Sequence, residues 1–185
     1  MVNDVLKDLE GSVEKAMEAL HRDLGKVRTG RANVAMLDGV RVDYYGTPTP
    51  LNQVAAVSAP DPRLIVIKPW EKRLIPEIAQ AIREAQLGIN PGTDSDVVRL
   101  PIPALTQDRR KELTKVVKRI GEDARVAVRN CRRDARELLD VAGKDGEITE
   151  DDVEQGHKKV QLVIDKSIAK IDDIIEKKQA EIMEV

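Results

Sequence analysis

The residues with the clearest chemical potential are arginines grouped in one short stretch. Five of them fall within the thirteen residues ARVAVRNCRRDAR, 124–136, interleaved with alanine, valine and a cysteine. The planar guanidinium group donates forked hydrogen bonds, which suit phosphate oxygens better than the point charge of lysine does. A helix with arginines along one side could therefore bind a polyanion.

Residues for catalysis or metal binding are not grouped in this way. Neither phosphate-binding glycine motif, G-x-G-x-x-G or G-x-x-x-x-G-K-[ST], occurs in the chain. The two histidines, His21 and His157, are expected on different helices, and Cys131 falls on an apolar helix face. The acidic run EDDVE, 150–154, fits the first turn of a helix, where carboxylates favour the helix dipole, better than a metal site. We therefore expect no enzyme activity, no metal and no cofactor.

Helical periodicity places the basic residues around this stretch on one side of a helix. At 100° per residue, seven of them fall within about 100° of arc, on a face that we call the basic strip. The basic strip consists of Arg110, Lys111, Lys118, Arg125, Arg129, Arg132 and Arg136. Arg133 lies on its margin. The apolar face expected on the same helix contains Leu113, Val117, Ile120, Ala124, Ala127, Cys131, Ala135 and Leu138.

Three interpretations of the basic strip are open. It could be solvated, although a solvated helix face usually mixes charges to gain i,i+4 pairs. It could pair with the acidic C-terminal segment, since residues 106–143 hold 11 basic and 7 acidic residues whereas 144–185 hold 7 and 12. It could bind nucleic acid, which we favour because exposed ion pairs contribute only about 0–1 kcal/mol each. With 2% aromatic residues, binding would be to the backbone and shape of folded RNA.

Three long amphipathic helices are predicted to carry these residues. Apolar residues recur with a mean spacing of about 3.5 over 2–28, and helical periodicity returns over 106–141 and from 149 onward. Thr149 and Asp152 are spaced as a capping box at the start of the last helix. Each helix has one apolar stripe, so the simplest way to bury all three is a three-helix bundle.

The middle of the chain is predicted to fold as a small α+β unit inserted into this bundle. Strands are expected at 39–45, 52–59, 63–68 and 96–103, a turn at 46–50 and a helix at 71–88. The expected domains are therefore a discontinuous bundle, 1–29 with 106–185, and an inserted β/α/β domain, 30–105. The two chain crossings between them contain Gly30, Pro101 and Pro103, which predicts a hinge.

The sequence also indicates the cellular compartment in which the protein acts. No apolar run approaches the roughly 18 residues of a membrane span, and the N-terminus lacks the apolar segment of a secretory signal. A single cysteine excludes an internal disulfide. We expect a cytoplasmic protein that does not bind membranes.

Two long stretches, RTGRANVAMLDGVRVDYYGTPTPLNQVA at 28–55 and LPIPALTQDRRKELTKVVKRIGEDARVAVRNCRRDA at 100–135, carry a family resemblance. They resemble the signature sequences of the ribosome recycling factor family. The resemblance implies an L-shaped, two-domain α+β protein, in which a flexible elbow joins a long three-helix bundle to an inserted small β/α/β domain.

The resemblance also implies a function. A member of this family binds post-termination ribosomes as a monomer, and its bundle contacts large-subunit ribosomal RNA near the intersubunit bridges. With elongation factor G and GTP, it promotes subunit dissociation and the release of mRNA and tRNA, without catalytic activity of its own. The alternative is a non-catalytic helical adaptor protein whose basic helix is ion-paired internally.

Family residues can be matched to this chain at two places. The ribosome-contacting arginines match Arg110, Arg129 and Arg132, with Arg133 adjacent. The basic strip adds Lys118 and Arg125 to this expected ribosomal RNA-binding set. The elbow matches the hinge residues Thr29, Gly30, Arg31, Pro103, Ala104, Leu105 and Thr106. The residues that would contact elongation factor G are not assigned.

Overall fold

The computed structural model describes residues 1–184 and divides the chain into two compact units. The bundle unit contains Met1–Thr29 and Gln107–Val185, and the inserted unit contains Gly30–Thr106. Within the described residues, no helix is both long and apolar enough to cross a membrane.

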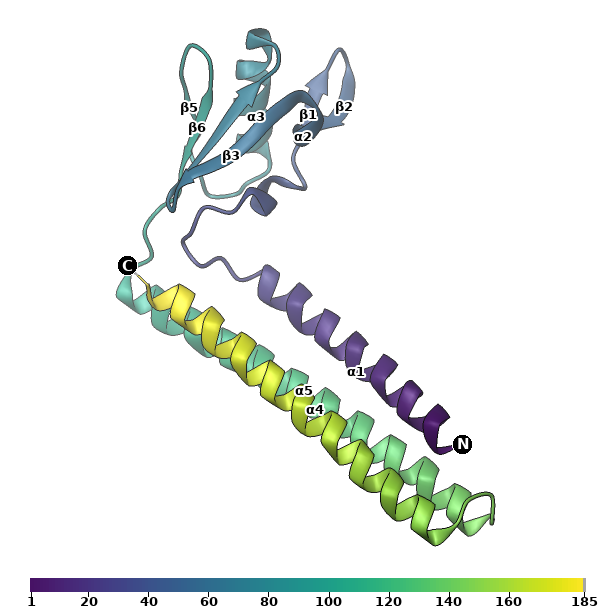
Figure 1. Cartoon of the computed structure of the whole chain (residues 1–185). Coiled ribbons are helices and arrows are strands. Elements are labelled where there is room, and N and C mark those ends of the chain that lie inside the picture. Colours follow the sequence, from purple (N-terminus) through teal and green to yellow (C-terminus); the bar gives the residue numbers. More distant parts are fainter. Residues whose placement is uncertain (185) are drawn as a thin grey trace. The chain divides into compact units, whose positions relative to one another are not determined.

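The bundle unit consists of three long helices that pack along one another (Figure 1). They are α1 (Val2–Gly25), α4 (Gln107–Lys144) and α5 (Glu150–Met183). Their apolar stripes form the core, as the sequence pattern predicted. The largest fully buried side chains of this core are Leu20, Leu139, Ile164, Ile171 and Ile182. The first helix ends at Gly25, earlier than the predicted end near residue 28.

The buried face of α4 differs in phase from the predicted one. Leu138, expected in the core, is 54% exposed, whereas its neighbour Leu139 is completely buried. The buried residues of α4 are Leu113, Val117, Gly121, Ala124, Val128, Ala135, Leu139 and Ala142. Their centre lies about 40° closer to the basic strip than the predicted apolar face did. Part of the basic strip is therefore turned toward a neighbouring helix.

Two glycines allow close contact between α4 and α5. A Cβ atom added to Gly121 would lie 2.7 Å from Cγ1 of Ile175, and one added to Gly156 would lie 2.8 Å from Cδ1 of Leu139. The predicted capping box at the start of α5 is confirmed. The Thr149 hydroxyl accepts from the Asp152 backbone N–H at 3.2 Å, and the Asp152 carboxylate accepts from the Thr149 backbone N–H at 3.2 Å.

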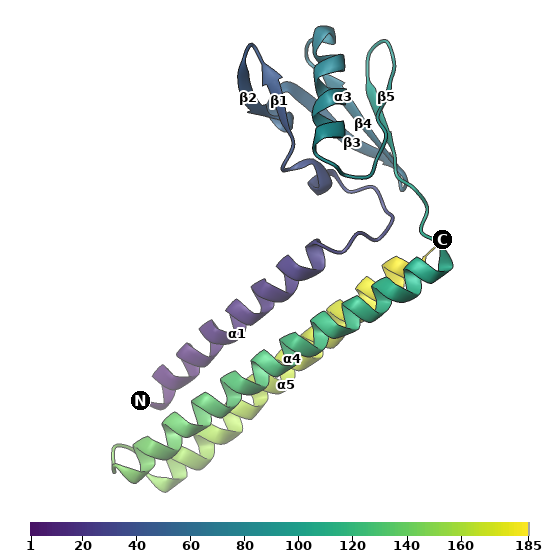
Figure 2. The same ribbon diagram turned by 180° about the vertical axis from the view of Figure 1, so that it is seen from behind.

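The inserted unit contains two antiparallel sheets and a helix. One sheet has the order β1-β2 and the other the order β3-β4-β6-β5. Figures 1 and 2 show α3 on one face of the larger sheet. The elements are η1 (Val34–Leu37), β1 (Arg41–Tyr44), β2 (Thr47–Pro50), α2 (Leu51–Val54), β3 (Ala55–Asp61), β4 (Leu64–Pro69), η2 (Lys72–Leu74), α3 (Ile75–Glu84), β5 (Gly92–Thr93) and β6 (Val98–Pro101).

Several local predictions in the inserted unit were wrong. The segment 46–50 was expected to be a turn, but Thr47–Pro50 is strand β2, which pairs with Arg41–Tyr44. Its prolines are tolerated because it is an edge strand. The turn begins one residue earlier than predicted and consists of Tyr45 and Gly46, which both have positive φ. The strand predicted at 52–59 begins only at Ala55, after the short helix α2. The two-residue strand β5 was not predicted.

Candidate nucleic-acid interface

The basic strip lies along α4, and four of its members reach atoms of α5. Nη1 of Arg110 donates to the carbonyl oxygens of Met183 and Glu184, at 2.9 and 3.3 Å. Because unpaired carbonyls at a helix end carry partial negative charge, this guanidinium group stabilises the C-terminus of α5. Arg110 was expected to contact the ribosome, and its side chain is half-buried against α5.

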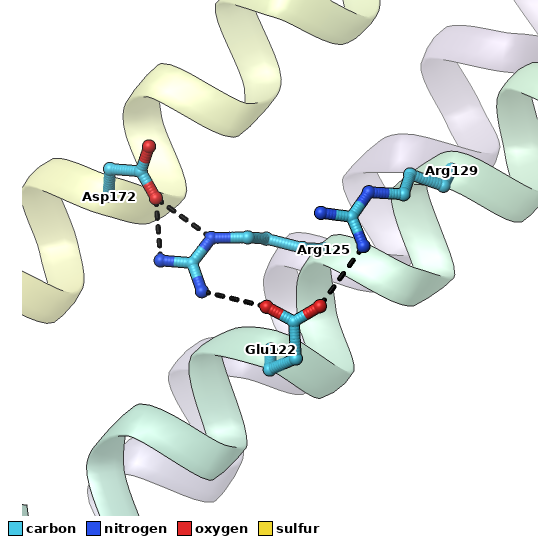
Figure 3. A network of polar contacts seen from close by, with 4 residues as sticks. All are labelled: Glu122, Arg125, Arg129 and Asp172. Carbon is cyan, nitrogen blue, oxygen red and sulfur yellow. Dashed lines mark hydrogen bonds and ion pairs between the residues drawn. The ribbon is translucent and has the colours of Figure 1, made fainter.

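Arg125 joins the two helices through an ion pair with a carboxylate of α5 (Figure 3). Its Nε and Nη2 donate to Oδ1 of Asp172 at 2.9 and 2.6 Å, and its Nη1 donates to Oε2 of Glu122 at 3.2 Å. The hydrogen bond to Asp172 is the main cause that raises the pKa of Arg125. With 22% of its side chain exposed, Arg125 fits the internal-pairing interpretation of the basic strip.

Arg132 and Arg136 contact α5 more weakly. Nη1 of Arg132 donates to Oε1 of Gln161 at 3.4 Å, and Nη2 of Arg136 lies 3.5 Å from Nδ1 of His157. The amide of Gln161 is uncharged, and His157 is charged only if it is protonated. Neither arginine is neutralised by a carboxylate of α5 among residues 1–184.

The remaining predicted residues face solvent. Arg129 is 49% exposed and donates from Nη1 to Oε1 of Glu122 at 3.0 Å. Arg133 is 74% exposed, and its Nε lies 3.7 Å from Oδ1 of Asp134. Lys118 is exposed and makes no ion pair within the described part of the chain. An external anion can reach these three cations, although Glu122 and Asp134 already contact Arg129 and Arg133.

An open hollow of about 560 Å³ on α4 brings several of these side chains together, and we call it the arginine groove. Its lining residues are Arg129, Asn130, Arg132, Arg133, Arg136, Glu137, Asp140, Val141 and Lys144. Three of the expected ribosome-binding residues are therefore neighbours here, whereas Arg110, Lys118 and Arg125 lie outside the groove. Lys144 was missed because residues 142–148 were expected to be a turn, although α4 continues to Lys144.

Hydrogen bonds within each unit hold one expected hinge residue, Thr29, and two residues that flank the hinge segments, Ala32 and Ile102. In the bundle unit, the Thr29 hydroxyl donates to Oε1 of Glu181 at 2.9 Å. In the inserted unit, the backbone N–H groups of Ala32 and Ile102 donate to the carbonyls of Pro62 and Arg63, at 2.7 and 2.8 Å. The first crossing has residues 30–31 between Thr29 and Ala32, and the second has residues 103–106 between Ile102 and Gln107, the first residue of α4.

Gly30 occupies a backbone conformation that suits glycine. Its φ is +75°, and a Cβ atom added there would lie 2.8 Å from Cγ of Leu105. Two predicted hinge residues, one from each crossing, are therefore in direct contact within the inserted unit.

The inserted unit carries an exposed cluster that the sequence did not reveal. The guanidinium carbon of Arg73 lies 3.8 Å from the centroid of the Tyr45 ring, and Nε of Arg73 lies 2.6 Å from Oε2 of Glu71. The hydrogen bonds from Arg73 and then from Tyr44 lower the pKa of Glu71. Because 28 positions separate Tyr45 from Arg73, no local motif could have indicated the cluster.

The described residues indicate neither a metal-binding cluster nor a reactive thiol. Within residues 1–184, no three His, Cys, Asp or Glu side chains gather where they could hold a metal ion. Cys131 is partly buried, and this burial raises the pKa of its thiol, which disfavours the reactive thiolate.

Comparison with known proteins identifies the family. The family model for the ribosome recycling factor matches residues 20–183. The chain is 55% identical to the ribosome-recycling factor of Anaeromyxobacter dehalogenans, over 100% of this chain and 98% of that protein. It is 53% identical to the ribosome-recycling factor of Sorangium cellulosum, over 100% of both chains.

Solved structures agree with the sequence comparisons. A solution structure of the ribosome recycling factor matches with a TM-score of 0.78 and 36% identity, over 100% of this chain and 98% of that one. The T. thermophilus ribosome recycling factor, placed with E. coli elongation factor G on the E. coli post-termination complex, matches with a TM-score of 0.66 and 39% identity, over 98% of both chains. The chain therefore belongs to the ribosome recycling factor family.

Proposed function

We propose that this protein binds post-termination ribosomes and, with elongation factor G and GTP, promotes subunit dissociation and the release of mRNA and tRNA. The observation that carries the proposal is the full-length similarity to ribosome recycling factors, one of which stands with elongation factor G on a post-termination complex. The protein would act as a monomeric, non-catalytic translation factor in the cytoplasm.

The arginine groove is the part of the bundle unit that would contact large-subunit ribosomal RNA near the intersubunit bridges. It brings together Arg129, Arg132, Arg133, Arg136 and Lys144 on one helix. Forked guanidinium donors bind phosphate oxygens without regard to base identity, which suits recognition of folded RNA by backbone and shape.

The six expected RNA-binding residues would divide into two roles. Arg110 and Arg125 hold α5 against α4. Arg110 binds the C-terminal carbonyl oxygens of α5, and Arg125 binds Asp172 of α5. Lys118, Arg129 and Arg133 face solvent, and Arg132 is half-buried with an uncharged partner. The solvent-facing residues and Arg132 would therefore bind RNA, while Arg110 and Arg125 would keep the helix that presents them in place.

The hinge would lie at residues 30–31 and 103–106. Next to these segments, the Thr29 side chain is hydrogen-bonded to Glu181 within the bundle unit, and the backbone N–H groups of Ala32 and Ile102 are hydrogen-bonded to Pro62 and Arg63 within the inserted unit. Rotation that is confined to two short segments would allow the units to move as rigid bodies when elongation factor G acts.

The adaptor alternative accounts for the basic strip less well. Among the described residues, Arg125 is the only member of the basic strip with an ion pair to α5. Internal contacts therefore explain Arg125, through its ion pair, and Arg110, through its hydrogen bonds to carbonyl oxygens, but among the described residues no carboxylate of α5 pairs with a cation of the arginine groove.

Sedimentation with large ribosomal subunits at increasing salt tests the proposed contact. If about five phosphates are neutralised, log affinity should fall against log salt with a slope of roughly −4. Arg132→Glu should weaken binding, whereas Lys170→Glu, a charge reversal on α5 outside the arginine groove, should bind like the parent. Affinity that does not change with salt, or full binding by Arg132→Glu, would contradict the proposal.

A further inference from the structure

Glu122 is a carboxylate shared between two arginines (Figure 3), one of which, Arg129, lines the arginine groove. Its Oε1 accepts from Nη1 of Arg129 at 3.0 Å, and its Oε2 accepts from Nη1 of Arg125 at 3.2 Å. All three residues lie on α4, so they keep their spacing while the helix is intact.

The two arginines depend on Glu122 to different degrees. Arg125 is also held by two hydrogen bonds to Asp172 of α5, and only 22% of its side chain is exposed. Arg129 has Glu122 as its one carboxylate partner within residues 1–184, is 49% exposed and lines the arginine groove. Loss of Glu122 would therefore leave Arg125 in place and release Arg129.

Glu122 remains charged and accessible beside the groove. Hydrogen bonds from Arg129 and then Arg125 hold its pKa below the ordinary value for glutamate, and its side chain is 53% exposed. A phosphate that approaches Arg129 therefore meets a carboxylate already bound to the same guanidinium group. Because exposed ion pairs are weak, the exchange of one anion for the other is easy.

We infer that Glu122 is an internal competitor that lowers the affinity of Arg129 for the phosphates of RNA. This inference rests on the proposed function. When RNA binds, a phosphate oxygen replaces Oε1 of Glu122 on Arg129, and Arg125 retains the carboxylate through Oε2. When RNA leaves, Oε1 returns to Arg129. The carboxylate thus limits how tightly the factor holds the ribosome and speeds its release.

Binding to large ribosomal subunits at fixed salt, measured as affinity and dissociation rate, tests the inference. Glu122→Gln should bind about three- to fivefold more tightly, because an exposed pair contributes at most about 1 kcal/mol. The matched control is Asp123→Asn, which removes the same charge from the next residue. Asp123 is exposed and its side chain has no partner within the described chain, so this variant should change affinity less than twofold.

A second pair of variants shows whether Glu122 acts through Arg129. In an Arg129→Gln background, Glu122→Gln should give no gain in affinity, because the cation for which Glu122 and the RNA phosphates compete is absent. A gain that persists there, a gain equal to that of Asp123→Asn, or weaker binding by Glu122→Gln would each overturn the inference. If the parent protein itself fails to bind large subunits, the proposed function fails instead.

Discussion

Asp172 of α5 accepts two hydrogen bonds from Arg125 of α4, from Nε at 2.9 Å and from Nη2 at 2.6 Å. The pair joins the helix that carries the arginine groove to its neighbour. A residue that the sequence places among RNA-binding arginines thus has a structural partner within the bundle unit.

Removal of the Asp172 charge should lower stability. Asp172→Asn should reduce the free energy of unfolding by about 0.5–1.5 kcal/mol, the usual contribution of a hydrogen bond to a partly buried group. Asp173→Asn is the matched control, since among residues 1–184 Asp173 pairs only with Lys177 on its own helix. This substitution should cost less than about 0.5 kcal/mol. Urea denaturation measures both. Equal losses would show that the ion pair between α4 and α5 contributes no more to stability than the pair within α5.

Close packing of α4 on α5 predicts that Gly121→Ala is destabilising. The added methyl group would lie 2.7 Å from Cγ1 of Ile175, and such overpacking costs about 1–3 kcal/mol, against a gain of up to about 1 kcal/mol in helix propensity. Gly11→Ala in α1 meets no atom within 4 Å and should be stabilising. Thermal unfolding followed by circular dichroism separates the two. A higher midpoint for Gly121→Ala would contradict the packing.

Substitution at Gly30 should perturb the inserted unit and the hinge. Gly30→Ala combines an unfavourable positive φ with a methyl group 2.8 Å from Cγ of Leu105, whereas Gly46→Ala has the positive φ alone. An alanine in this conformation costs about 1–2 kcal/mol, and the contact with Leu105 adds to that cost. Fluorescence of Trp70, the single tryptophan, reports unfolding of the inserted unit.

Gly30→Ala should therefore lose more stability than Gly46→Ala and should also slow ribosome splitting. The reverse order of stability would show that Leu105 moves aside without cost. Unchanged splitting by Gly30→Ala would argue against a hinge at this residue.

The capping box of α5 predicts a pH-dependent contribution from Asp152. Hydrogen bonds from the Thr149 hydroxyl and then the Thr149 backbone N–H lower the pKa of Asp152. Because the folded-state pKa lies below the unfolded one, the stabilisation is full above the unfolded value, about 4. It is lost as the pH falls through the folded value.

Asp152→Asn should therefore lower the thermal midpoint at about pH 7, and the difference from the parent should shrink toward about pH 2. Asp151→Asn, in the same first turn, is the control for the helix dipole. If the two variants show the same pH dependence, the capping box is not its source.

The long helices could be predicted because their apolar periodicity is strong over many turns. The phase of α4 could not be predicted as well, since Leu138 and Leu139 are both apolar and only packing against α1 and α5 decides which is buried. The short strands depend on partners that are distant in sequence. Thr47–Pro50 is a strand because it pairs with Arg41–Tyr44, although its own composition is typical of a turn.

The candidate site was predictable in part for the same reason. Helical spacing alone places Arg129, Arg132 and Arg136 near one another, and the structure gathers them in the arginine groove. Which arginines are paired internally depends on the register between α4 and α5, which brings Asp172 to Arg125 and Gln161 to Arg132. Helical periodicity within one segment contains no information about that register.

The proposed function is tested by the breakdown of post-termination ribosomes, measured with purified components. We predict that subunits separate only when this protein, elongation factor G and GTP are all present, and that omission of any one leaves the complexes intact. Separation at the same rate without this protein, or by this protein alone, would contradict its assignment as a recycling factor.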